Sequence, residues 1–444
     1  MHIIFEASLS GTLDEFDFSA FPQLKFLYLS DTGLYGTIPA GIGNLTSLVR
    51  LVISSNPYLR GAIPRSIGQL KHLAVLRLTF LGLSATLPEE VGNLTALEDL
   101  NLSFVTLTGP IPPTIGMLGK LQELRLVGNN LTGSIPMEIG NMTELQTMFL
   151  QGNYLEGQLP GTISHLVKLQ SLDVSTNQLV GHIFPELGNS SFLKLGGISV
   201  AYNNFSGMFP SSICVGGGLV MISAEYNGFT GFQHQAFQNC TTLHYVDFTA
   251  NNIVAELRGI FSEHPGELTS MAFSQNQLHG TLLTGCIPED IGNLVLLESL
   301  DLSGNQLSGK IPQSLAALKS ISVLNLSTNE LSGRIPTGDQ LRTLTDPSIY
   351  SNNPGLCGVP LEDCINSSTP TQTEKSQDED REALWLYCFV AAGFIFGFWL
   401  YWGIFLFRSE TWRCAFYQYV DNMQAKATKK MYSCMSCFQA SGSE

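Results

Sequence analysis

The stretch from Leu121 to Glu144 reads LQELRLVGNNLTGSIPMEIGNMTE, and the next, from Leu145 to Lys168, reads LQTMFLQGNYLEGQLPGTISHLVK. Both fit the pattern L-x-x-L-x-L-x-x-N-x-L-x-G-x-I-P-x-x-I-G-x-L-x-x. The Asn position of this pattern recurs mostly after 24 residues, and otherwise after 25, 26 or 29: Thr32, Asn56, Leu81, Val105, Asn129, Asn153, Asn177, Asn203, Asn227, Asn251, Asn276, Asn305 and Asn329. This periodicity predicts one array of thirteen units rather than several globular domains.

Each unit contains a short strand that cannot bury its apolar side alone. The leucines of L-x-L point to one side of the strand and the residues between them to the other. Stacked units pair such strands about 4.8 Å apart in a parallel sheet, so thirteen units predict a curved face roughly 60 Å long. The Asn can donate to and accept from backbone groups inside the coil. Gly and Pro of G-x-I-P then turn the chain away from the sheet.

These repeats resemble those of plant leucine-rich-repeat proteins, which carry the same L-x-G-x-I-P phrase, over about Leu9 to Cys364. The resemblance implies an α/β-type leucine-rich-repeat solenoid with a right-handed twist and a concave parallel β-sheet. It also implies a second short strand at the L-x-G-x-I-P segment. Receptor kinases, receptor-like proteins and secreted inhibitors all contain such repeats.

The repeat period ends after Pro336, and residues 337–364 are expected to form a C-terminal cap. The last unit of a solenoid exposes its apolar end, so a closing segment is needed there. Cys357 and Cys364 are close in sequence, which favours a small local disulfide as the staple of this cap.

A membrane anchor is expected beyond the cap. Residues 365–382 form an acidic spacer, and 383–407 contain no charged side chain. As a helix, 25 residues at about 1.5 Å each reach roughly 37 Å, enough to cross a hydrocarbon core of about 30 Å. Basic residues follow the span, which places the tail 408–444 in the cytosol and the repeats outside the cell. A tail of this length is too short for a kinase domain.

Two segments outside the repeats resemble plant receptor-like proteins: NPGLCGVPL at Asn353 to Leu361 and TWRCAFYQYVDNM at Thr411 to Met423. The resemblance implies a single-pass plasma-membrane glycoprotein without a kinase, which would associate with an adaptor kinase and, on ligand binding, with a co-receptor kinase. Gly393 and Gly397 form a G-x-x-x-G pattern that allows close approach of two membrane helices.

Further modifications are expected outside the cell. Cys214 and Cys240 fall on the same side of adjacent units and form either a disulfide or two buried thiols. All ten N-glycosylation sequons precede the expected membrane span: Asn44, Asn93, Asn101, Asn130, Asn141, Asn189, Asn204, Asn239, Asn325 and Asn366. A glycan at Asn101 or Asn325 would cover part of the concave face, because both are strand positions.

No catalytic, metal-binding or cofactor-binding pattern is present in the sequence. The His residues have no metal-ligand spacing with a neighbour, and there is no nucleophile motif or phosphate loop. The charges of 22 basic and 37 acidic residues, a net of −15, argue against nucleic-acid binding. We therefore expect no enzyme and no cofactor.

Ligand binding is expected at the variable, outward-facing strand positions, because the other residues of each unit build the coil. Aromatic residues occupy the position before the Asn in two pairs of adjacent units, and Arg residues lie near the first pair. These residues form a candidate anchor for a peptide or an acidic group; the alternative is that they simply pack along the sheet. The candidates are Arg77, Phe80, Phe104, Arg125, Phe149, Tyr202 and Tyr226.

The sequence departs from the family pattern in two places. Residues 1–23 form only a partial repeat before the thirteen units of 24–336, and they lack both a signal peptide and the usual N-terminal cap, which favours a truncated chain. Between Gln277 and Gly292 the closing phrase of one unit occurs twice, and a lone Cys286 lies there. The favoured function is a receptor-like protein in plant defence that recognises a peptide, protein or glycan; the alternatives are an inhibitor or decoy of microbial wall-degrading enzymes, and a truncated, non-functional receptor.

Overall fold

The computed structural model of the 444-residue chain describes residues 10–187, 195–233, 237, 240–257, 267–279 and 287–364, and the backbone of a strand at 2–5. The chain divides into two units, Met1–Ile365 and Asn366–Glu444, and every described residue belongs to the first unit. The predicted spacer, membrane span and tail lie outside the described residues. So do Gly393, Gly397 and Cys286.

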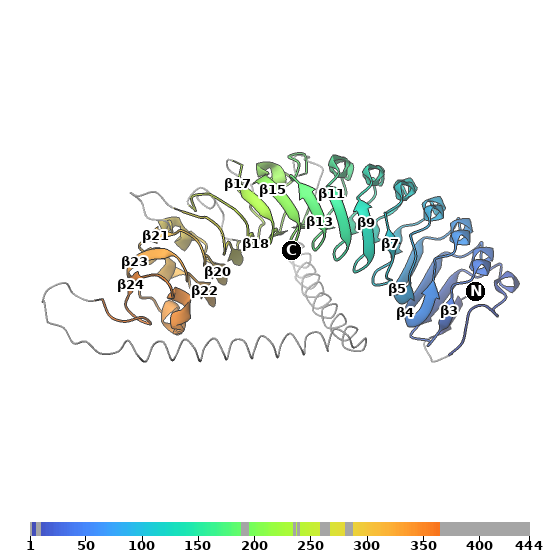
Figure 1. Ribbon diagram of the computed structural model, residues 1–444, viewed down its shortest axis with the longest axis horizontal. Helices are drawn as coiled ribbons and strands as arrows, with labels where there is room; N and C mark the ends of the chain where they lie inside the picture. The colour runs from blue at the N-terminus through green and yellow to red at the C-terminus, as the bar shows by residue number, and fades with distance from the viewer. Residues whose placement is uncertain are drawn as a thin grey trace, which may run out of the picture. The chain divides into compact units, whose positions relative to one another are not determined.

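The described residues form an arc of stacked turns, with one large parallel sheet along its inner side (Figure 1). This sheet has 15 strands in the described part of the chain. Its main path runs through β1 (His2–Phe5), β2 (Phe26–Ser30), β4 (Arg50–Gly61), β5 (Val75–Leu83), β6 (Asp99–Asn101), β8 (Glu123–Arg125), β10 (Thr147–Phe149), β12 (Ser171–Asp173), β14 (Gly197–Ser199), β16 (Met221–Ser223), β18 (Tyr245–Asp247), β19 (Ser270–Ala272), β20 (Ser299–Asp301) and β22 (Val323–Asn325), while β3 (Tyr35–Thr37) pairs with β4. The predicted concave parallel sheet is therefore confirmed.

The second strand implied by the family resemblance is also present. These strands form two further parallel sheets from the L-x-G-x-I-P segments. One contains β7 (Thr108–Gly109), β9 (Asn130–Ser134), β11 (Tyr154–Gln158), β13 (Gln178–Gly181), β15 (Asn204–Phe209) and β17 (Gly228–Phe232); the other contains β21 (Ser308–Gly309), β23 (Glu330–Arg334) and β24 (Gly355–Cys357).

The outer side of the arc carries short 3₁₀ helices, so the α/β class expected from the sequence is built without α-helices in the described residues (Figure 1). They are η1 (Phe18–Ala20), η2 (Ala40–Asn44), η3 (Arg65–Gln69), η4 (Glu89–Asn93), η5 (Pro113–Met117), η6 (Met137–Asn141), η7 (Gly161–His165), η8 (Ser211–Cys214), η9 (Glu289–Asn293) and η10 (Gln313–Ala317). Two more 3₁₀ helices, η11 (Leu341–Thr343) and η12 (Pro347–Tyr350), belong to the C-terminal segment, and η12 lies beside β22 of the large sheet. In most of the outer helices the Pro of I-P stands just before the first residue, as Pro136 does with φ −67°. Five residues are too few for an α-helix to satisfy its backbone groups.

The Gly of the I-G-x-L segment lets adjacent outer turns approach closely. A Cβ placed on Gly116 would collide with the backbone carbonyl oxygen of Glu138 in the next turn, and one on Gly92 with that of Thr114. The glycine is thus required by the packing of one turn on the next, a reason that the sequence pattern alone did not reveal.

From Asn129 onward, the asparagines form a continuous ladder through the core. In a typical turn, the N–H of Leu131 donates to Asn153 Oδ1 at 3.1 Å, and Asn153 Nδ2 donates to the carbonyls of Leu126 and Leu150 at 2.9 and 3.0 Å. The donor and acceptor roles predicted for these residues are therefore confirmed. Each Asn joins its own turn to the preceding one.

The ladder adapts where the sequence departs from the pattern. Leu81 replaces Asn in one turn, and there β4 and β5 are long and pair as far as Gly61 and Leu83. Asn305 follows the 29-residue spacing, yet its Oδ1 still accepts from Leu278 N–H at 3.0 Å. The extra residues of this unit therefore leave the ladder intact.

The C-terminal segment closes the array and extends the ladder by one position that the sequence pattern missed. Asn353 Oδ1 accepts from Leu331 N–H at 3.0 Å, as the preceding ladder asparagines do in their turns. Backbone N–H groups of Leu326 and Thr328 donate to the carbonyls of Ile349 and Ser351, so the residues around η12 cover the end of the large sheet.

Candidate functional site

The outward-facing residues of the large sheet form rows across the turns. In the row at the middle of L-x-L, the register aligns residues 24 or 26 positions apart in sequence. Neighbours in a row are therefore about 4.8 Å apart. Along β5 to β18 this row contains Arg77, Asn101, Arg125, Phe149, Asp173, Ser199, Ser223 and Asp247.

The four aromatic candidates before the ladder position have a left-handed backbone. Their φ values are 54° at Phe80, 56° at Phe104, 52° at Tyr202 and 53° at Tyr226. A non-glycine residue in this region costs about 1–2 kcal/mol relative to the right-handed conformation. The turn imposes this conformation, because the equivalent Gly128 also has a positive φ of 63°.

Both predicted aromatic pairs stack across adjacent turns. The ring centroids of Phe80 and Phe104 are 4.9 Å apart at an interplanar angle of 13°, and those of Tyr202 and Tyr226 are 4.6 Å apart at 15°. The tyrosines are 49% and 45% exposed. The structure therefore places two separate aromatic platforms on the concave face, one near each end of the row described above.

Gly128 makes room for the first platform. A Cβ on Gly128 would overlap the Phe104 ring, which therefore lies against the backbone of the following turn. A side chain at position 128 would therefore displace the Phe104 ring from its position in the platform.

The two arginines near the first platform already have carboxylate partners. Arg77 forms an ion pair with Asp99, and Arg125 forms one with Glu123. The hydrogen bond from Arg77 to Asp99 raises the pKa of the guanidinium. The charges of these four side chains cancel, so they provide no net positive charge to attract an acidic group. What this patch offers a ligand is aromatic and polar contacts.

Two further observations complete the first patch. Arg125 Cζ lies 5.8 Å from the centroid of the Phe149 ring, within the range of a cation–π contact. Asp99 is 8% exposed, and its buried Oδ1 accepts no hydrogen bond from the described residues. The structure thus brings together Arg77, Phe80, Phe104, Arg125 and Phe149, as expected from the sequence, on β5 to β10 and the segments that follow these strands.

Acidic groups surround the second platform. Tyr245 Oη donates to Asp247 Oδ2 at 3.1 Å, and Ser223 Oγ donates to Glu225 Oε2 at 2.7 Å. Burial is the main cause that raises the pKa of Glu225, with a smaller contribution from the charge of Asp247. Glu225 was not among the sequence candidates, which came from two other rows of outward positions. The sequence feature that could have identified it is an acidic residue two positions after the middle residue of L-x-L.

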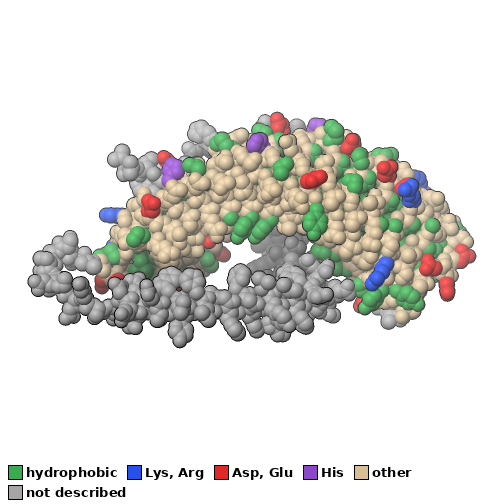
Figure 2. All heavy atoms as spheres, viewed as in Figure 1, with side chains coloured by type: hydrophobic (Ala, Val, Ile, Leu, Met, Phe, Trp, Pro, Cys, Tyr) green, Lys and Arg blue, Asp and Glu red, His purple; other side chains and the backbone are tan. Residues whose placement is uncertain are grey.

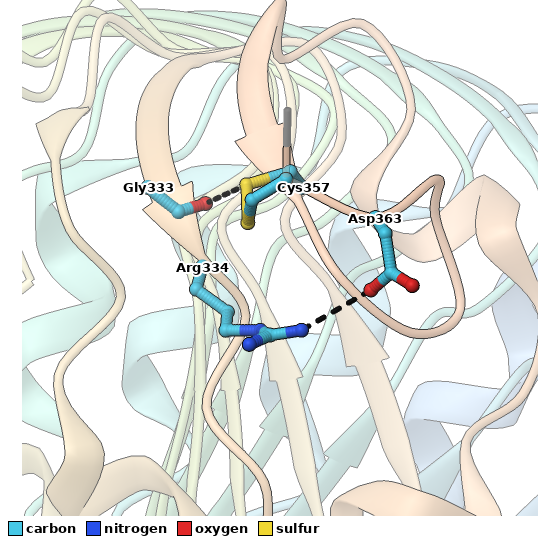
Figure 3. Close-up of a disulfide and its surroundings, with 5 residues drawn as sticks. Gly333, Arg334, Cys357 and Asp363 are labelled. Carbon is cyan, nitrogen blue, oxygen red and sulfur yellow. Dashed lines mark hydrogen bonds and ion pairs between the residues drawn. A yellow bond between two sulfur atoms is a disulfide. The ribbon is translucent and has the colours of Figure 1, made fainter. Parts of the chain in front are cut away.

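Two disulfides lie in the described residues. Cys214 and Cys240 are bonded, with Cα atoms 5.0 Å apart, so of the two alternatives the structure has the disulfide. Cys357 and Cys364 are bonded in the cap, with Cα atoms 4.9 Å apart. Figure 3 shows this second disulfide beside the strand that contains Gly333, and the nearby ion pair of Arg334 with Asp363 at 3.1 Å.

The described sequons fall into two groups. Asn101 and Asn325 are half-buried on strands β6 and β22 of the concave face, where each Oδ1 accepts from a serine N–H two residues later. The others are exposed and lie elsewhere: Asn44, Asn93, Asn130, Asn141 and Asn204. Asn189, Asn239 and Asn366 lie outside the described residues.

Within the described residues, no helix has the length and apolar character needed to cross a membrane. No group of three or more His, Cys, Asp or Glu in this part of the chain could hold a metal ion. On the face shown in Figure 2, charged side chains are scattered, and hydrophobic side chains gather in small groups along the inner edge of the arc.

Sequence comparisons identify the repeats. Models of the leucine-rich repeat region and of the leucine-rich repeat match residues 10–134, 119–179 and 296–318. The chain is 42% identical over 67 residues to the LRR receptor-like serine/threonine-protein kinase EFR of Arabidopsis thaliana, which is 15% of this chain and 6% of that protein.

Solved structures of plant receptors are similar over most of the array. The plant peptide hormone receptor RGFR1 in complex with RGF2 matches with a TM-score of 0.63 and 34% identity, covering 74% of this chain and 55% of that one. PEPR1–AtPEP1 matches with a TM-score of 0.60 and 30% identity, covering 73% and 48%. The ectodomain of the receptor kinase GASSHO1/SCHENGEN3 from Arabidopsis thaliana, in complex with CASPARIAN STRIP INTEGRITY FACTOR 2, gives 0.60 and 30%, covering 82% and 48%.

The chain spans about half the length of these three solved chains. Leucine-rich repeats therefore build the matched residues, and the array resembles the ectodomains of plant leucine-rich-repeat receptors.

Proposed function

We propose that this chain is a cell-surface receptor-like protein whose repeat array binds an extracellular ligand on its concave face. The observation that carries the proposal is the pair of stacked aromatic platforms on outward positions of the large sheet. Exposed aromatic side chains held at fixed spacing are typical anchors of a binding surface. A peptide is the favoured ligand, because the similar solved receptors include a peptide hormone receptor in complex with RGF2.

The proposal extends to the residues outside the described ones. Residues 383–407 would anchor the protein in the plasma membrane, with the sequons outside the cell and the tail 408–444 in the cytosol. The protein would not be an enzyme and would signal through an adaptor kinase and a co-receptor kinase, in plant defence. Gly393 and Gly397 would mediate the association with the adaptor.

The partner proposal is tested by affinity purification of the tagged chain from plant plasma membranes. We expect receptor kinases to co-purify with the unmodified chain and to be lost when Gly393 and Gly397 are both replaced by Leu. Replacement of Ala391 and Ala392 by Leu is the matched control for added bulk. Absence of kinases from both preparations, together with inhibition of microbial pectinases by the protein, would favour the inhibitor or decoy instead.

The ligand proposal is tested at the first aromatic platform. Once a ligand is identified by cross-linking to intact cells, Phe104→Ala and Arg125→Ala should each weaken its binding about tenfold or more, the usual effect of losing an interface anchor. Lys168→Ala is a control, because Lys168 pairs with Glu144 at an exposed position outside the strands of the large sheet. Unchanged binding by both platform variants would exclude this patch as the contact surface.

A further inference from the structure

The concave face around the second aromatic platform carries acidic groups without basic partners. Glu225 and Asp247 face outward there, near Tyr202 and Tyr226, and Asp173 lies in the same row as Asp247, on β12. Among the described residues, no Lys or Arg occupies an outward position on or just after strands β10 to β19. This region therefore differs from the first patch, in which each acidic side chain has an arginine partner.

The neighbours of these carboxylates are neutral donors. Asp247 Oδ1 accepts from the Thr249 N–H at 2.8 Å, and Oδ2 accepts from Tyr245 Oη at 3.1 Å. The imidazole of His244, in the residue before β18, has its Nε2 3.7 Å from Glu267 Oε2, so it is directed to another carboxylate. The negative charge of Glu225 and Asp247 is thus left uncompensated by the described residues.

The pKa shifts of these acidic and tyrosine side chains agree with an accumulation of negative charge. Burial raises the pKa of both Asp173 and Glu225, and the Asp247 charge adds to the shift at Glu225. The pKa of Tyr202 is also raised, through burial and then through the charges of its neighbours. A bound cation would relieve this accumulation of negative charge.

We infer that Tyr202, Tyr226, Glu225 and Asp247, which we call the acidic tyrosine patch, bind the guanidinium group of an arginine in an extended peptide ligand. This inference rests on the proposed receptor function and specifies its ligand. A guanidinium is planar, stacks on aromatic faces and donates to carboxylates in a fixed fork, so it matches an exposed tyrosine beside two carboxylates. A compact ammonium or a polycationic glycan would use the carboxylates but would lose the stacking contact.

The distance between the two platforms sets the spacing in the ligand. Phe104 follows β6 and Tyr202 follows β14, with three strands of the large sheet between them. Four intervals of about 4.8 Å give roughly 19 Å, which an extended peptide crosses in about six residues at roughly 3.3 Å each. A peptide that contacts both platforms would therefore carry its arginine about six residues from an apolar side chain.

Glycosylation would leave the acidic tyrosine patch open. Of the sequons in the described part of the chain, those on strands of the large sheet are Asn101 on β6 and Asn325 on β22. The strands of the large sheet between them, which are β8, β10, β12, β14, β16, β18, β19 and β20, have no sequon at a described strand position. The patch at β14 to β18 lies within this uncovered stretch.

The test uses the full-length chain, purified in detergent from plant membranes, and three fluorescent probe peptides. The first has the sequence GSGRGSGRGSG, the second has citrulline in place of both arginines, and the third has glutamate there. Citrulline keeps the shape of arginine and removes its charge. We expect the arginine peptide to bind at least tenfold more tightly than either other probe, and its binding to weaken when salt is raised, because the contact is electrostatic.

The variants locate the binding. Glu225→Gln combined with Asp247→Asn, and separately Tyr226→Ala, should each weaken binding of the arginine peptide at least tenfold. Asp301→Asn is the matched control, since Asp301 occupies the same row two strands beyond β18 and lies outside the patch. Circular dichroism melting establishes that each variant is folded, and Tyr226→Phe, which retains the ring, should restore binding.

Each outcome decides the inference. Equal binding of the citrulline peptide, an equal loss in Asp301→Asn, or binding of a chitosan hexamer in place of the peptide would overturn it. Co-purification of receptor kinases with the same preparation separates the two proposals. If kinases co-purify and the arginine peptide does not bind, the receptor function stands and the arginine subsite is wrong; if neither occurs, both are wrong.

Discussion

At the scale of single residues, the ladder asparagines each satisfy backbone groups from two turns. Asn251 Oδ1 accepts from Phe229 N–H at 3.0 Å, and its Nδ2 donates to the carbonyls of Ala224 and Phe248 at 3.0 and 3.1 Å. The next residue, Asn252, is exposed. Two identical side chains thus stand side by side in opposite environments.

This contrast gives a prediction for stability. Asn251→Ala removes the side-chain acceptor of the Phe229 N–H, while the carbonyls of Ala224 and Phe248 still accept from Asn227 and Asn276. We expect a loss of about 1–3 kcal/mol in the free energy of unfolding, the usual cost of one unsatisfied buried group. Asn252→Ala should change it by less than about 0.5 kcal/mol, as is usual for exposed positions. Urea unfolding of the repeat array, followed by circular dichroism, compares the two; equal losses would show that the ladder contributes nothing specific.

Asp173 provides a prediction for pH dependence. Burial raises the pKa of its carboxyl, although hydrogen bonds from Ser175 and Ser199 act in the opposite direction. The uncharged Phe149 and Ser199 flank it in the row, and Glu225 is the charged group nearby. Because the folded state prefers the protonated acid, this carboxyl favours folding most below its unfolded pKa of about 3.9 and ceases to do so as pH rises through the raised value.

Asp173→Asn should therefore raise the melting temperature at pH 7 and leave it nearly unchanged at about pH 3.5, where the acid is protonated in both states. The amide oxygen can still accept from the Ser175 N–H, which donates to Asp173 Oδ1 at 2.9 Å. Melting curves of both proteins across this pH range provide the measurement. A variant that is less stable at pH 7 would show that the hydrogen bonds outweigh the cost of burying the charge.

At the scale of structural elements, the outer 3₁₀ helices pack so closely that they require glycine. Gly116 in η5 faces the Glu138 carbonyl oxygen in η6, whereas Gly119, three residues later, has no atom within 4 Å of an added Cβ. A required glycine in η5 and a replaceable one just after it therefore lie within a single turn of the array.

We expect Gly116→Ala to push the two turns apart and to cost about 1–3 kcal/mol, as overpacking generally does. Gly119→Ala should be neutral or slightly stabilising, because it restricts the unfolded chain without a clash. Thermal melting of the repeat array distinguishes them. Similar melting temperatures for the two variants would mean that the close approach of η5 and η6 is not maintained in solution.

At the scale of the whole repeat array, each turn contacts mainly its neighbours, so the array is close to one-dimensional. Strand β10 has the same register on β8 that β8 has on β6, with Thr147 opposite Glu123 and Glu123 opposite Asp99. A turn can therefore be removed at matching positions without altering the register of those that remain.

Deletion of residues 123–146 removes one turn and joins Gln122 to Thr147. We expect this protein to fold and to unfold cooperatively with a modestly lower urea midpoint, since one turn and one interface are lost. Deletion of 123–134 alone is the control and should prevent cooperative unfolding, because it breaks the register. If both deletions behaved alike, the turns would not be interchangeable units.

The repeat architecture follows from periodicity in the sequence. A spacing of 24 residues determines which strands pair, which leucines are buried and which asparagines form the ladder, because every turn faces the same partner positions. The same regularity brought Phe80 beside Phe104, Tyr202 beside Tyr226 and Cys214 beside Cys240.

Side-chain partners across turns were decided only in three dimensions. The pairing of Arg77 with Asp99 and the uncompensated charge of Glu225 and Asp247 depend on groups in different rows of the sheet, which no one-dimensional period relates. The need for glycine at Gly116 likewise depends on how closely two turns approach. The repeat period specifies where each backbone position lies. Charge balance and steric fit depend on which side chains occupy neighbouring positions in the folded array.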